Sequence, residues 1–414
     1  MEFETKYLII GGGIAGTACA ETLRKEDKNA RIIIVSDEPH RLYSRVLLTK
    51  PNFFHGKIPF DRIFLKDDKW YQDQKIELWL GRKAVHLDPV EHKITLDNTE
   101  VLKYEKLLLA VGGAPRRLDI PGADKKGIYY LRTIDETKEI IEAVKHAKKG
   151  VSLGGGIIGF EMAEMMVLGG LDTTFVLASK HYRDNVMGIE TAIAIEKSME
   201  EHGVKIKPEA KAVEILGDDH ITGIRFADGS ELECDFLVVG IGTVVPADFI
   251  TEAGIVVDQG IKATAKLKTN KPDTYTAGDC AQFYDPLVDE EIVHGSWANA
   301  QAQGQTAARN MMGHNEQYRY VSFFTTHGFG HAMTYVGDTR QNLPGREIIE
   351  RGTPGDKGYG RIVIEDNQLT GALFLDSTTD VQVIGKLIEK DVIIRDKKAV
   401  LADPDSDLNA LLPT

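Results

Sequence analysis

Cysteine is scarce in this sequence. Three thiols, Cys19, Cys234 and Cys280, are scattered over 414 residues, and no two of them have the spacing of a CxxC or CxxxxC motif. The spacing provides no zinc ligand set, so we expect no bound metal. Buried thiols in a reducing compartment are the simplest interpretation.

Long apolar runs and an excess of positive charge are also missing. No apolar run approaches the roughly 18 residues of a membrane helix. Lys and Arg number 50 against 63 Asp and Glu, and the formal charge of −13 argues against general affinity for nucleic acids. The first apolar strand begins within a few residues of Met1 and leaves no room for a leader peptide, so we expect a cytoplasmic protein.

The clearest motif is glycine-rich and lies near the N-terminus. The segment KYLIIGGGIAG joins an apolar run directly to Gly11-x-Gly13-x-x-Gly16, and residues 14–23 have helical character. This order of strand, glycine turn and helix suits the pyrophosphate of a dinucleotide. Glycine lets the backbone approach the phosphates, and the helix N-terminus supplies N–H groups. A glycine turn without a ligand is the alternative for a single motif of this kind.

The following segments extend this interpretation. Residues 31–35 (RIIIV) predict a second buried parallel strand, and Asp37 and Glu38 stand at its end. Either carboxylate there can accept hydrogen bonds from a ribose. The next stretch carries Arg45 and Lys50, which either face a pyrophosphate or an electron-rich ring or belong to a solvated helix face.

Two further segments complete the first copy of the pattern. Residues 76–96 contain alternating apolar and polar positions, which predict an antiparallel, hairpin-like excursion. Residues 104–115 (YEKLLLAVGGAP) predict a parallel strand whose glycine end meets a ligand.

The pattern then starts again. GVSLGGGIIGFEMAE (150–164) repeats the strand, the glycine turn and the helix, with Gly154, Gly156 and Gly159 in the motif positions. The segment DFLVVGIGTVVP (235–246) parallels the closing strand of the first copy. Two such copies predict two nucleotide-binding domains in tandem.

The last third of the chain changes in character. TYTAGDCA places Asp279 after a turn of small residues, and residues 294–312 predict a long helix whose N-terminus presents N–H groups. From about Tyr320, aromatic and β-branched alternation predicts antiparallel strands, followed by a helix at about 379–390. The tail after Ala402 is expected to be loosely attached.

In these residues the chain resembles the two-dinucleotide-binding-domain flavoproteins, and the nearest branch is the FAD-dependent NAD(P)H reductases of ferredoxin and rubredoxin. The resemblance covers essentially the whole chain. It rests on seven segments in family order: GGGIAG, DEPHRLYSRVLLTK, LLLAVGGAPRRLDIPG, GGGIIGFEMAE, VVGIGTVVP, TYTAGDCA and GSWANAQAQGQTAA.

The resemblance implies an α/β fold with two Rossmann-like domains, one for FAD and one for NAD(P), and a small C-terminal α+β domain. We expect residues 1–115 and 247–319 to form the FAD-binding domain and residues 116–246 the NAD(P)-binding domain. Residues 320–414 would form the C-terminal domain.

The family also implies an FAD site. The residues it places there are Gly11, Gly13, Ile14, Ala15, Gly16, Asp37, Glu38, Arg45, Lys50, Val85, Ala110, Arg116, Asp279 and Trp297. The three motif glycines would hold the pyrophosphate, Glu38 or Asp37 the adenosine ribose, and Arg45 and Lys50 would lie near the phosphates and the isoalloxazine.

Other members of this set have more local roles. Val85 would contact the adenine side through its backbone, and Arg116 would border the flavin. Asp279 would hold the ribityl–pyrophosphate region. Trp297 would lie by the pyrimidine side of the flavin, with its helix N-terminus facing N1 and O2.

A second implied set would serve NAD(P)H and the reaction. These residues are Gly154, Gly156, Ile157, Ile158, Gly159, Glu161, Lys180, Arg183, Gly240 and Gly242. Glu161 resembles the acid that pairs with Lys50 close to flavin N5, and we take this pair as the catalytic candidates.

The sequence departs from the family in two stretches. Tyr43-Ser44-Arg45-Val46 lacks the usual proline, and residues 323–327 (FFTTH) replace an SDQ-like start of the third domain. The second departure leaves the acceptor open. We interpret His327 as a packing or surface histidine.

The choice of pyridine nucleotide depends on the loop after residues 174–178. NAD-binding relatives usually carry an acid there, whereas this chain has none and continues with Lys180, His181 and Arg183. These basic residues can accept a 2′-phosphate, which favours NADPH, although both coenzymes stay open.

The scattered cysteines argue against the disulfide-reducing branch of the family, because the candidate positions near the flavin contain only Cys19, without a partner thiol. The sequence therefore predicts an FAD-dependent oxidoreductase that passes a hydride between NAD(P)H and flavin N5. Electrons would go onward to a carrier protein of the ferredoxin or rubredoxin type. An NAD(P)H oxidase or a nitrite-reductase-type electron-entry subunit is the first alternative, and a non-catalytic flavin redox sensor is the second. No nucleic-acid or membrane partner is expected.

Overall fold

The computed structural model describes residues 1–246 and 248–413, and the chain divides into two compact units. Unit 1 comprises Met1–Ser44, Asp61–Ala114 and Thr243–Tyr320, and unit 2 comprises Arg45–Phe60, Pro115–Gly242 and Val321–Thr414. Ala247 and Thr414, where predicted domain segments begin and end, lie outside the described residues. The three-domain division drawn from the sequence stays a prediction.

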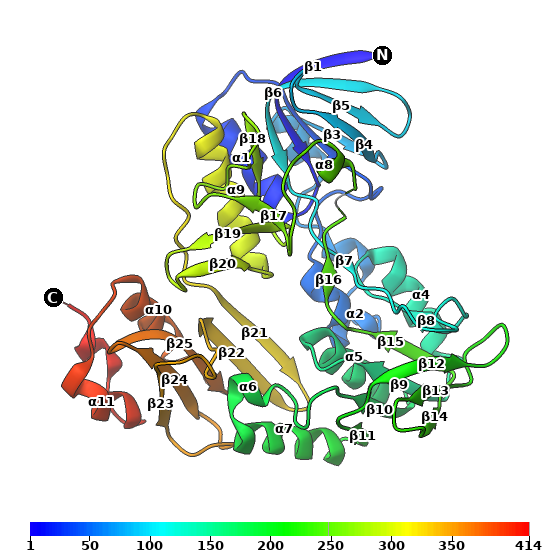
Figure 1. The fold of residues 1–414 in the computed structure, drawn as a ribbon, viewed down its shortest axis with the longest axis vertical. Helices are drawn as coiled ribbons and strands as arrows, with labels where there is room; N and C mark the ends of the chain where they lie inside the picture. The colour runs from blue at the N-terminus through cyan, green and yellow to red at the C-terminus, as the bar shows by residue number, and fades with distance from the viewer. Residues whose placement is uncertain (247, 414) are drawn as a thin grey trace. The chain divides into compact units, whose positions relative to one another are not determined.

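Unit 1 is built around a parallel sheet. Its strands β3, β2, β1, β6 and β18 pair in that order, and each neighbouring pair is parallel (Figure 1). They are β1 (Glu2–Ile10), β2 (Ile32–Ser36), β3 (Ile76–Leu80), β6 (Val101–Leu109) and β18 (Thr274–Thr276). The inner strand β2 is buried along its whole length, as its continuous apolar sequence predicts for a strand covered on both faces.

One strand of this sheet differs from the sequence prediction. Residues 76–96 were expected to form an antiparallel excursion, but β3 pairs with β2 in parallel. Only β4 (Ala84–Asp88) and β5 (Lys93–Leu96) are antiparallel, and β5 extends the sheet from β6. As an edge strand β3 is only partly buried, so its polar pattern resembles that of a half-exposed hairpin strand.

Two helices of unit 1 pack on each other. They are α1 (Ile14–Glu26) and α9 (Trp297–Met311) (Figure 1). A Cβ atom at Gly304 of α9 would lie 2.1 Å from the carbonyl oxygen of Ala15, so glycine permits this close approach. The buried sulfur of Cys19 on α1 lies 3.8 Å from the sulfur of Met311 on α9.

Smaller elements complete unit 1. They are α3 (Asp68–Asp73), α8 (Asp248–Glu252), β17 (Ile261–Ala263), β19 (Ala281–Asp285) and β20 (Glu290–Val293). Three short elements stand where the chain passes between the units: η2 (Phe60–Ile63), β7 (Ala114–Pro115) and β16 (Thr243–Val244).

Unit 2 contains a second parallel sheet, with the strand order β11, β10, β9, β15, β8. The strands are β8 (Ile128–Tyr129), β9 (Lys149–Leu153), β10 (Asp172–Val176), β11 (Val204–Lys207) and β15 (Phe236–Val239). The helices are α2 (Pro51–Phe54), α4 (Ile134–Val144), α5 (Ile157–Leu168), α6 (Asp184–Met187) and α7 (Ile189–Glu201), with the 3-10 turn η1 (Arg45–Thr49). A small antiparallel sheet adds β12 (Ala212–Leu216), β13 (Gly223–Phe226) and β14 (Glu231–Glu233).

The C-terminal part of unit 2 is an antiparallel sheet, as predicted, with the order β21, β22, β25, β24, β23. Its strands are β21 (Phe323–Gly328), β22 (His331–Gly337), β23 (Arg346–Arg351), β24 (Gly360–Glu365) and β25 (Gln368–Leu375). The predicted helix is α10 (Val381–Glu389), and η3 (Arg395–Lys397), α11 (Lys398–Ala402) and η4 (Leu408–Leu411) follow.

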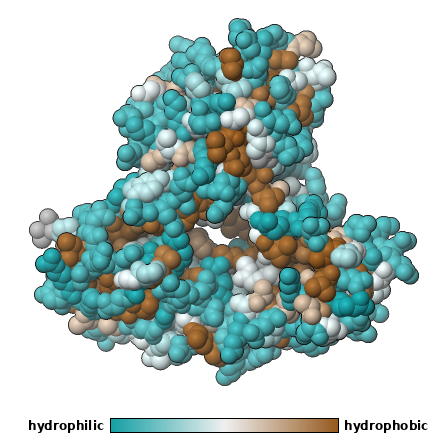
Figure 2. Space-filling view, in the orientation of Figure 1, coloured by the Kyte–Doolittle hydropathy of each residue, from teal (hydrophilic) through white to brown (hydrophobic). Residues whose placement is uncertain are grey.

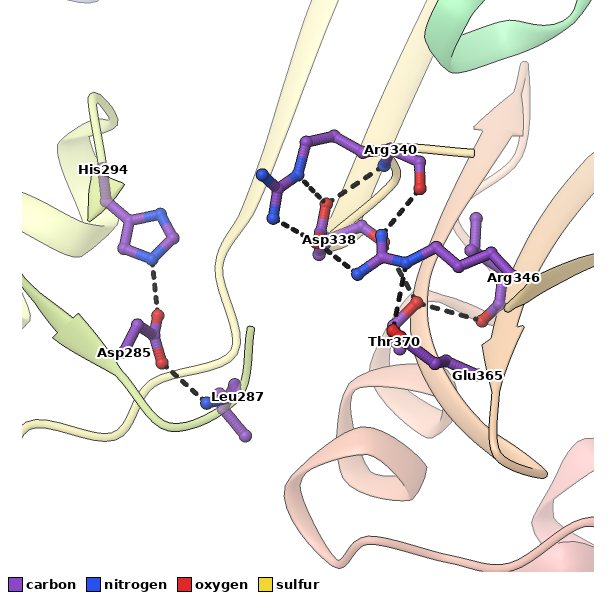
Figure 3. Close-up of polar contacts among 9 residues, drawn as sticks. Asp285, Leu287, His294, Asp338, Arg340, Arg346, Glu365 and Thr370 are labelled. Carbon is purple, nitrogen blue, oxygen red and sulfur yellow. Dashed lines mark hydrogen bonds and ion pairs between the residues drawn. The ribbon is translucent and has the colours of Figure 1, made fainter. Parts of the chain in front are cut away.

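The connection between β22 and β23 is fixed by a buried ion network (Figure 3). A carboxylate oxygen of Asp338 lies 2.7 Å from nitrogens of both Arg340 and Arg346, and the Arg346 side chain is 2% exposed. Glu365 provides a second carboxylate for Arg346, at 3.1 Å. Burial acts to raise the pKa of Asp338, but hydrogen bonds from the two arginines outweigh it and lower the pKa to about 2.

The chain end is firmly attached, so the expectation of a loose tail after Ala402 is wrong. The buried guanidinium of Arg351 donates to the carbonyl oxygens of Pro404 and Ser406, at 3.2 and 2.9 Å. Leu408 and Leu411 are buried as well. The anchoring arginine lies more than fifty positions away in sequence, so local composition gave no indication of it.

The surface agrees with the acidic, polar composition. On the face shown in Figure 2, hydrophilic residues predominate and hydrophobic residues emerge in separate patches. Among the described residues, no helix combines the length and the apolar character that a membrane span requires.

Candidate functional site

The two glycine turns have the same backbone geometry. Gly11 has φ of +118° and Gly154 has φ of +123°. A Cβ atom would lie 2.1 Å from the carbonyl oxygen of Ala110 in the first turn and 2.3 Å from that of Gly240 in the second. Only glycine fits either position, because both the conformation and the space exclude a side chain. Ala110 and Gly240 thus support the turns from the strands that close each copy.

The third glycine of each motif brings the helix onto the strand. A Cβ atom at Gly16 would lie 2.0 Å from the oxygen of Gly11, and one at Gly159 would lie 2.1 Å from the oxygen of Gly154. The middle glycine of each motif has room for a side chain. A Cβ atom at Gly13 would meet no described atom within 4 Å, and one at Gly156 would lie 3.6 Å from the oxygen of Gly240. The space beside Gly13 is therefore open.

Both motif helices begin without a side-chain cap within the described chain. Gly13 is the N-cap of α1 and Gly156 the N-cap of α5, and the first turn of neither helix carries an acidic residue. Free N–H groups at Ile14 and Ala15, and at Ile157 and Ile158, are thus available to an anion. A glycine cradle next to such a helix end fits a pyrophosphate group.

Three more of the predicted FAD residues lie in or directly after strands of the large sheet of unit 1. Asp37 and Glu38 follow β2; Asp37 is exposed, and Glu38 accepts a hydrogen bond from the Tyr43 hydroxyl at 2.6 Å. Val85 lies on β4 with 43% of its surface exposed.

Asp279 is placed by the turn before it. Gly278 has φ of +89°, and a Cβ atom there would lie 3.1 Å from the Cβ of Ala15, at the start of α1. The Gly278 N–H donates to the side-chain oxygen of Gln303 on α9, at 2.7 Å. Half-buried Asp279 therefore stands beside the first glycine turn.

The N-terminus of α9 is held by side chains that the sequence analysis missed. Trp297 is half-buried in its first turn, and the N-cap Ser296 accepts from the backbone and side-chain nitrogens of Asn299, at 3.3 and 2.9 Å. The Tyr318 hydroxyl donates to the Asn299 side-chain oxygen at 2.7 Å. No local sequence motif indicates this set, because Tyr318 lies 19 positions after Asn299 in the chain.

A histidine–aspartate pair precedes the same helix. The Nε2 atom of His294 lies 2.5 Å from Oδ2 of Asp285, whose side chain is 2% exposed (Figure 3). The other oxygen of Asp285 accepts from the backbone N–H of Leu287 at 2.9 Å. The pair ties the chain entering α9 to the end of β19.

Unit 2 brings Lys50 and Glu161 together, as the resemblance implied. The Lys50 ammonium forms an ion pair with Oε1 of Glu161, and the exposed fractions of the two side chains are 19% and 6%. The Thr49 hydroxyl donates to Oε2 of the same carboxylate. The Thr326 hydroxyl on β21 donates to Oε1 at 2.8 Å. The sequence analysis named neither threonine.

A second carboxylate follows one turn later on α5. Glu164 accepts a hydrogen bond from the backbone N–H of Phe329 at 2.6 Å. Burial raises the pKa of Glu164. The negative charge of neighbouring Glu161 also raises it, whereas the hydrogen bond from Phe329 acts to lower it.

The basic loop after β10 is only partly available to a coenzyme. Lys180 is exposed, whereas His181 pairs with Glu196 at 3.0 Å. The Arg183 guanidinium lies over the ring of buried Tyr335, 5.1 Å from its centre, and its Nε is buried without a hydrogen-bond partner among the described residues. The role of Arg183 as a phosphate ligand stays a prediction that this packing does not favour.

The remaining predicted residues also belong to unit 2. A guanidinium nitrogen of Arg45 donates to the carbonyl oxygen of Arg132 at 2.8 Å. Arg116 is exposed, and its backbone N–H donates to the carbonyl oxygen of Gly242 at 2.9 Å. The predicted FAD residues are thus divided: Arg45, Lys50 and Arg116 lie in unit 2 and the others in unit 1.

The three thiols are poorly suited to redox chemistry. Cys19, Cys234 and Cys280 are all free and buried. Burial raises the pKa of each, to about 12 for Cys234. A thiol that stays protonated is a weak nucleophile, which argues against a dithiol mechanism.

Comparison with known proteins identifies the family. Residues 5–304 match the model of the pyridine nucleotide-disulphide oxidoreductase family. The chain belongs to this family. Its fold class and the use of FAD and NAD(P)H by a flavoprotein oxidoreductase are therefore confirmed.

Individual relatives give a more detailed picture. The chain is 30% identical to a 5,5'-dehydrodivanillate O-demethylase ferredoxin reductase subunit of Sphingobium, over 98% of this chain and 97% of that protein. It is 28% identical to nitrite reductase [NAD(P)H] of Bacillus subtilis over 95% of this chain, but it spans only 48% of that protein. A ferredoxin reductase structure from Rhodopseudomonas palustris matches with a TM-score of 0.91 and 27% identity, over 98% of this chain and 99% of that one.

Proposed function

We propose that the protein is an FAD-dependent NAD(P)H reductase that passes electrons to a carrier protein of the ferredoxin or rubredoxin type. The observation that carries the proposal is the duplicated glycine turn, one on the parallel sheet of each unit, with matching backbone angles and matching contacts. Two such cradles fit two dinucleotides. The relatives named as ferredoxin reductases, which this chain covers almost end to end, support the carrier.

Residues of unit 1 would bind FAD and orient its flavin ring. Gly11, Gly13 and Gly16 would bind the FAD pyrophosphate, with Asp37 or Glu38 at the ribose. The α9 N-terminus would place its N–H groups and positive dipole end near the pyrimidine side of the flavin. The other members of the predicted FAD set keep the roles that the family implies.

In unit 2 the second glycine turn would bind NAD(P)H. The Lys50–Glu161 pair would lie near flavin N5. There the Lys50 ammonium would provide a positive charge, and Glu161 would hold that ammonium in one orientation. When bound, FAD supplies hydride acceptance and one-electron release. The protein contributes orientation and exclusion of water, so no side chain needs to act as a general acid or base.

A second candidate function is electron entry into a larger reductase. The match to about half of the Bacillus subtilis nitrite reductase favours it. In either case we propose a cytoplasmic location, since NAD(P)H is available there.

Steady-state electron transfer tests the proposal. The FAD-loaded protein is mixed with NADH or NADPH and with a ferredoxin, a rubredoxin or oxygen as acceptor. Rapid reduction of either carrier, faster than oxygen consumption, is the expected result. Oxygen consumption alone would indicate an oxidase, and slow turnover with every acceptor, including a one-electron dye, would favour the redox sensor.

A further inference from the structure

The carboxylate of Glu161 receives three donors from two separate segments of unit 2: the adjacent residues Thr49 and Lys50, and Thr326 on β21. Lys50 and Thr326 both reach Oε1, while Thr49 reaches Oε2. A carboxylate offers about four acceptor positions, so most of its capacity is used. The Glu161 side chain is 6% exposed, which leaves little room for water to replace a missing donor.

We propose that Thr326 is a positioning residue for the Lys50–Glu161 pair: its hydroxyl fixes the rotation of the Glu161 carboxylate and thereby the direction of the Lys50 ammonium. The expected effect of Thr326 on flavin reduction rests on the proposed function, whereas its effect on the orientation of Lys50 does not. The terminal torsion of a glutamate is broad and roughly two-fold, so a carboxylate holds one orientation only when a firmly placed donor reaches each oxygen. Without Thr326, Oε1 would keep only the long and flexible lysine.

The hydroxyl of Thr326 comes from a rigid part of the C-terminal sheet. At the end of β21, the backbone N–H of Phe329 donates to Glu164 at 2.6 Å, and its carbonyl accepts from the Ser198 hydroxyl at 2.7 Å. A Cβ atom at Gly328 would lie 2.4 Å from the ring of Phe160. Residues of α5 and α7 therefore hold the β21–β22 turn in place, and Thr326 itself is 1% exposed.

The neighbouring residue provides a matched control. Side chains alternate along a strand, and the Thr325 hydroxyl pairs with that of Thr334 across β21 and β22, at 2.9 Å. Thr325→Val removes the same chemical group from the same strand, but on the face away from Glu161. Thr326→Val is nearly isosteric, and Thr326→Ser restores the hydroxyl.

The first measurement is direct and needs no turnover. Brief acetylation of the FAD-loaded proteins, with mass spectrometry of each lysine, reports how firmly Lys50 is held. In Thr326→Val we expect Lys50 to be modified several-fold faster relative to the other lysines, with wild-type rates in Thr326→Ser and Thr325→Val. Equal labelling of Lys50 in wild type and Thr326→Val would overturn the proposal, whatever the reaction of the protein.

The second measurement separates positioning from packing. Anaerobic stopped-flow mixing gives the limiting rate of flavin reduction and the apparent Kd of the nucleotide. Loss of one hydrogen bond to a charged group predicts a limiting rate about tenfold lower in Thr326→Val, with the Kd unchanged and rescue by serine. An equal slowing in Thr325→Val, or no rescue by serine, contradicts the positioning role. Failure of wild type to be reduced by either nucleotide counts against the proposed function instead, and the labelling result still decides on Thr326.

Discussion

At the scale of the residue, the loop after β10 shows how packing changes the meaning of a basic sequence. Lys180, His181 and Arg183 together suggest a site for a 2′-phosphate. In the structure His181 is paired with Glu196, and Arg183 lies over Tyr335. Only Lys180 is exposed, so a preference for NADPH would depend on this one residue.

Two substitutions in this loop should therefore act differently. We expect Lys180→Ala to raise the Kd of NADPH about fivefold or more, since an ion pair with phosphate is lost, and to leave the Kd of NADH unchanged. Arg183→Leu should lower the free energy of unfolding by about 1 kcal/mol through loss of the cation–π contact, with no change in the NADPH/NADH ratio. Titration of tryptophan fluorescence and urea unfolding measure the two effects. A changed coenzyme ratio in Arg183→Leu would restore the role first predicted for it.

The residue scale also marks the limit of sequence reasoning. Gly11 and Gly154 were recognised because a turn with positive φ needs glycine at a fixed distance from the helix. Lys50 and Glu161 were paired only through the family resemblance, since 111 positions separate them. Thr326 lies 165 positions from Glu161, in a stretch that departs from the family, and no local signal predicted their contact.

At the scale of the element, the ends of the two motif helices carry the binding function. The middle glycine of each motif is the informative position, because an added Cβ is tolerated by the folded chain. At Gly13 it would meet no described atom within 4 Å, and at Gly156 its nearest neighbour would be 3.6 Å away. A loss caused by alanine at these positions would therefore report a ligand and not a clash.

Paired alanine variants test which turn binds which dinucleotide. We expect Gly13→Ala to fold normally but to bind FAD at least about tenfold more weakly. The added methyl group would push the pyrophosphate away from the backbone N–H groups, beyond the distance at which they can form hydrogen bonds. Gly156→Ala should keep FAD and lose affinity for NAD(P)H by a similar factor. Circular dichroism and flavin content after gel filtration provide the measurement, with Gly16→Ala as the variant that should not fold. Full FAD content in Gly13→Ala would contradict the assignment.

The β22–β23 connection gives a prediction on stability. Asp338→Asn removes the charge that faces buried Arg346. We expect the free energy of unfolding at pH 7 to fall by about 3 kcal/mol. This is the lower end of the range for breaking a buried ion pair, because Glu365 remains as a partner of Arg346. The pKa of Asp338 is lowered to about 2 in the folded protein, against about 3.9 in an unfolded chain. The stabilisation is therefore complete above about pH 4 and is lost as the pH falls toward 2.

Urea unfolding at pH 7, 5 and 3 checks this dependence. The difference between wild type and Asp338→Asn should be the same at pH 7 and 5 and smaller at pH 3. A difference that grows at low pH would show that Asp338 is not held as a charged group in the folded state.

At the scale of the whole molecule, the sequence predicted the architecture well where the signal is local and repeated. The two glycine motifs, the buried parallel strands and the antiparallel C-terminal sheet all follow from short-range patterns. Strand β3 was misread because an edge strand is half-covered and resembles a hairpin. The attachment of the C-terminal tail was missed because it depends on Arg351, which is distant in sequence.

The grouping of the chain into units was equally hidden. Residues 45–60 belong with the second sheet, although they follow the first glycine motif closely in sequence. This segment contains both Thr49 and Lys50, which contact Glu161. Its membership in unit 2 depends on long-range contacts that no periodicity reveals.

The central claim is that this chain carries electrons from a pyridine nucleotide through FAD, and anaerobic mixing of the yellow FAD-loaded protein with NADH and with NADPH tests it most directly. The account predicts loss of the flavin absorbance at micromolar nucleotide within the mixing time for at least one coenzyme. The same bleaching should be absent or strongly slowed in Gly156→Ala. Flavin that stays oxidised with both nucleotides, but is reduced by reduced ferredoxin, would contradict entry of electrons at the second glycine turn.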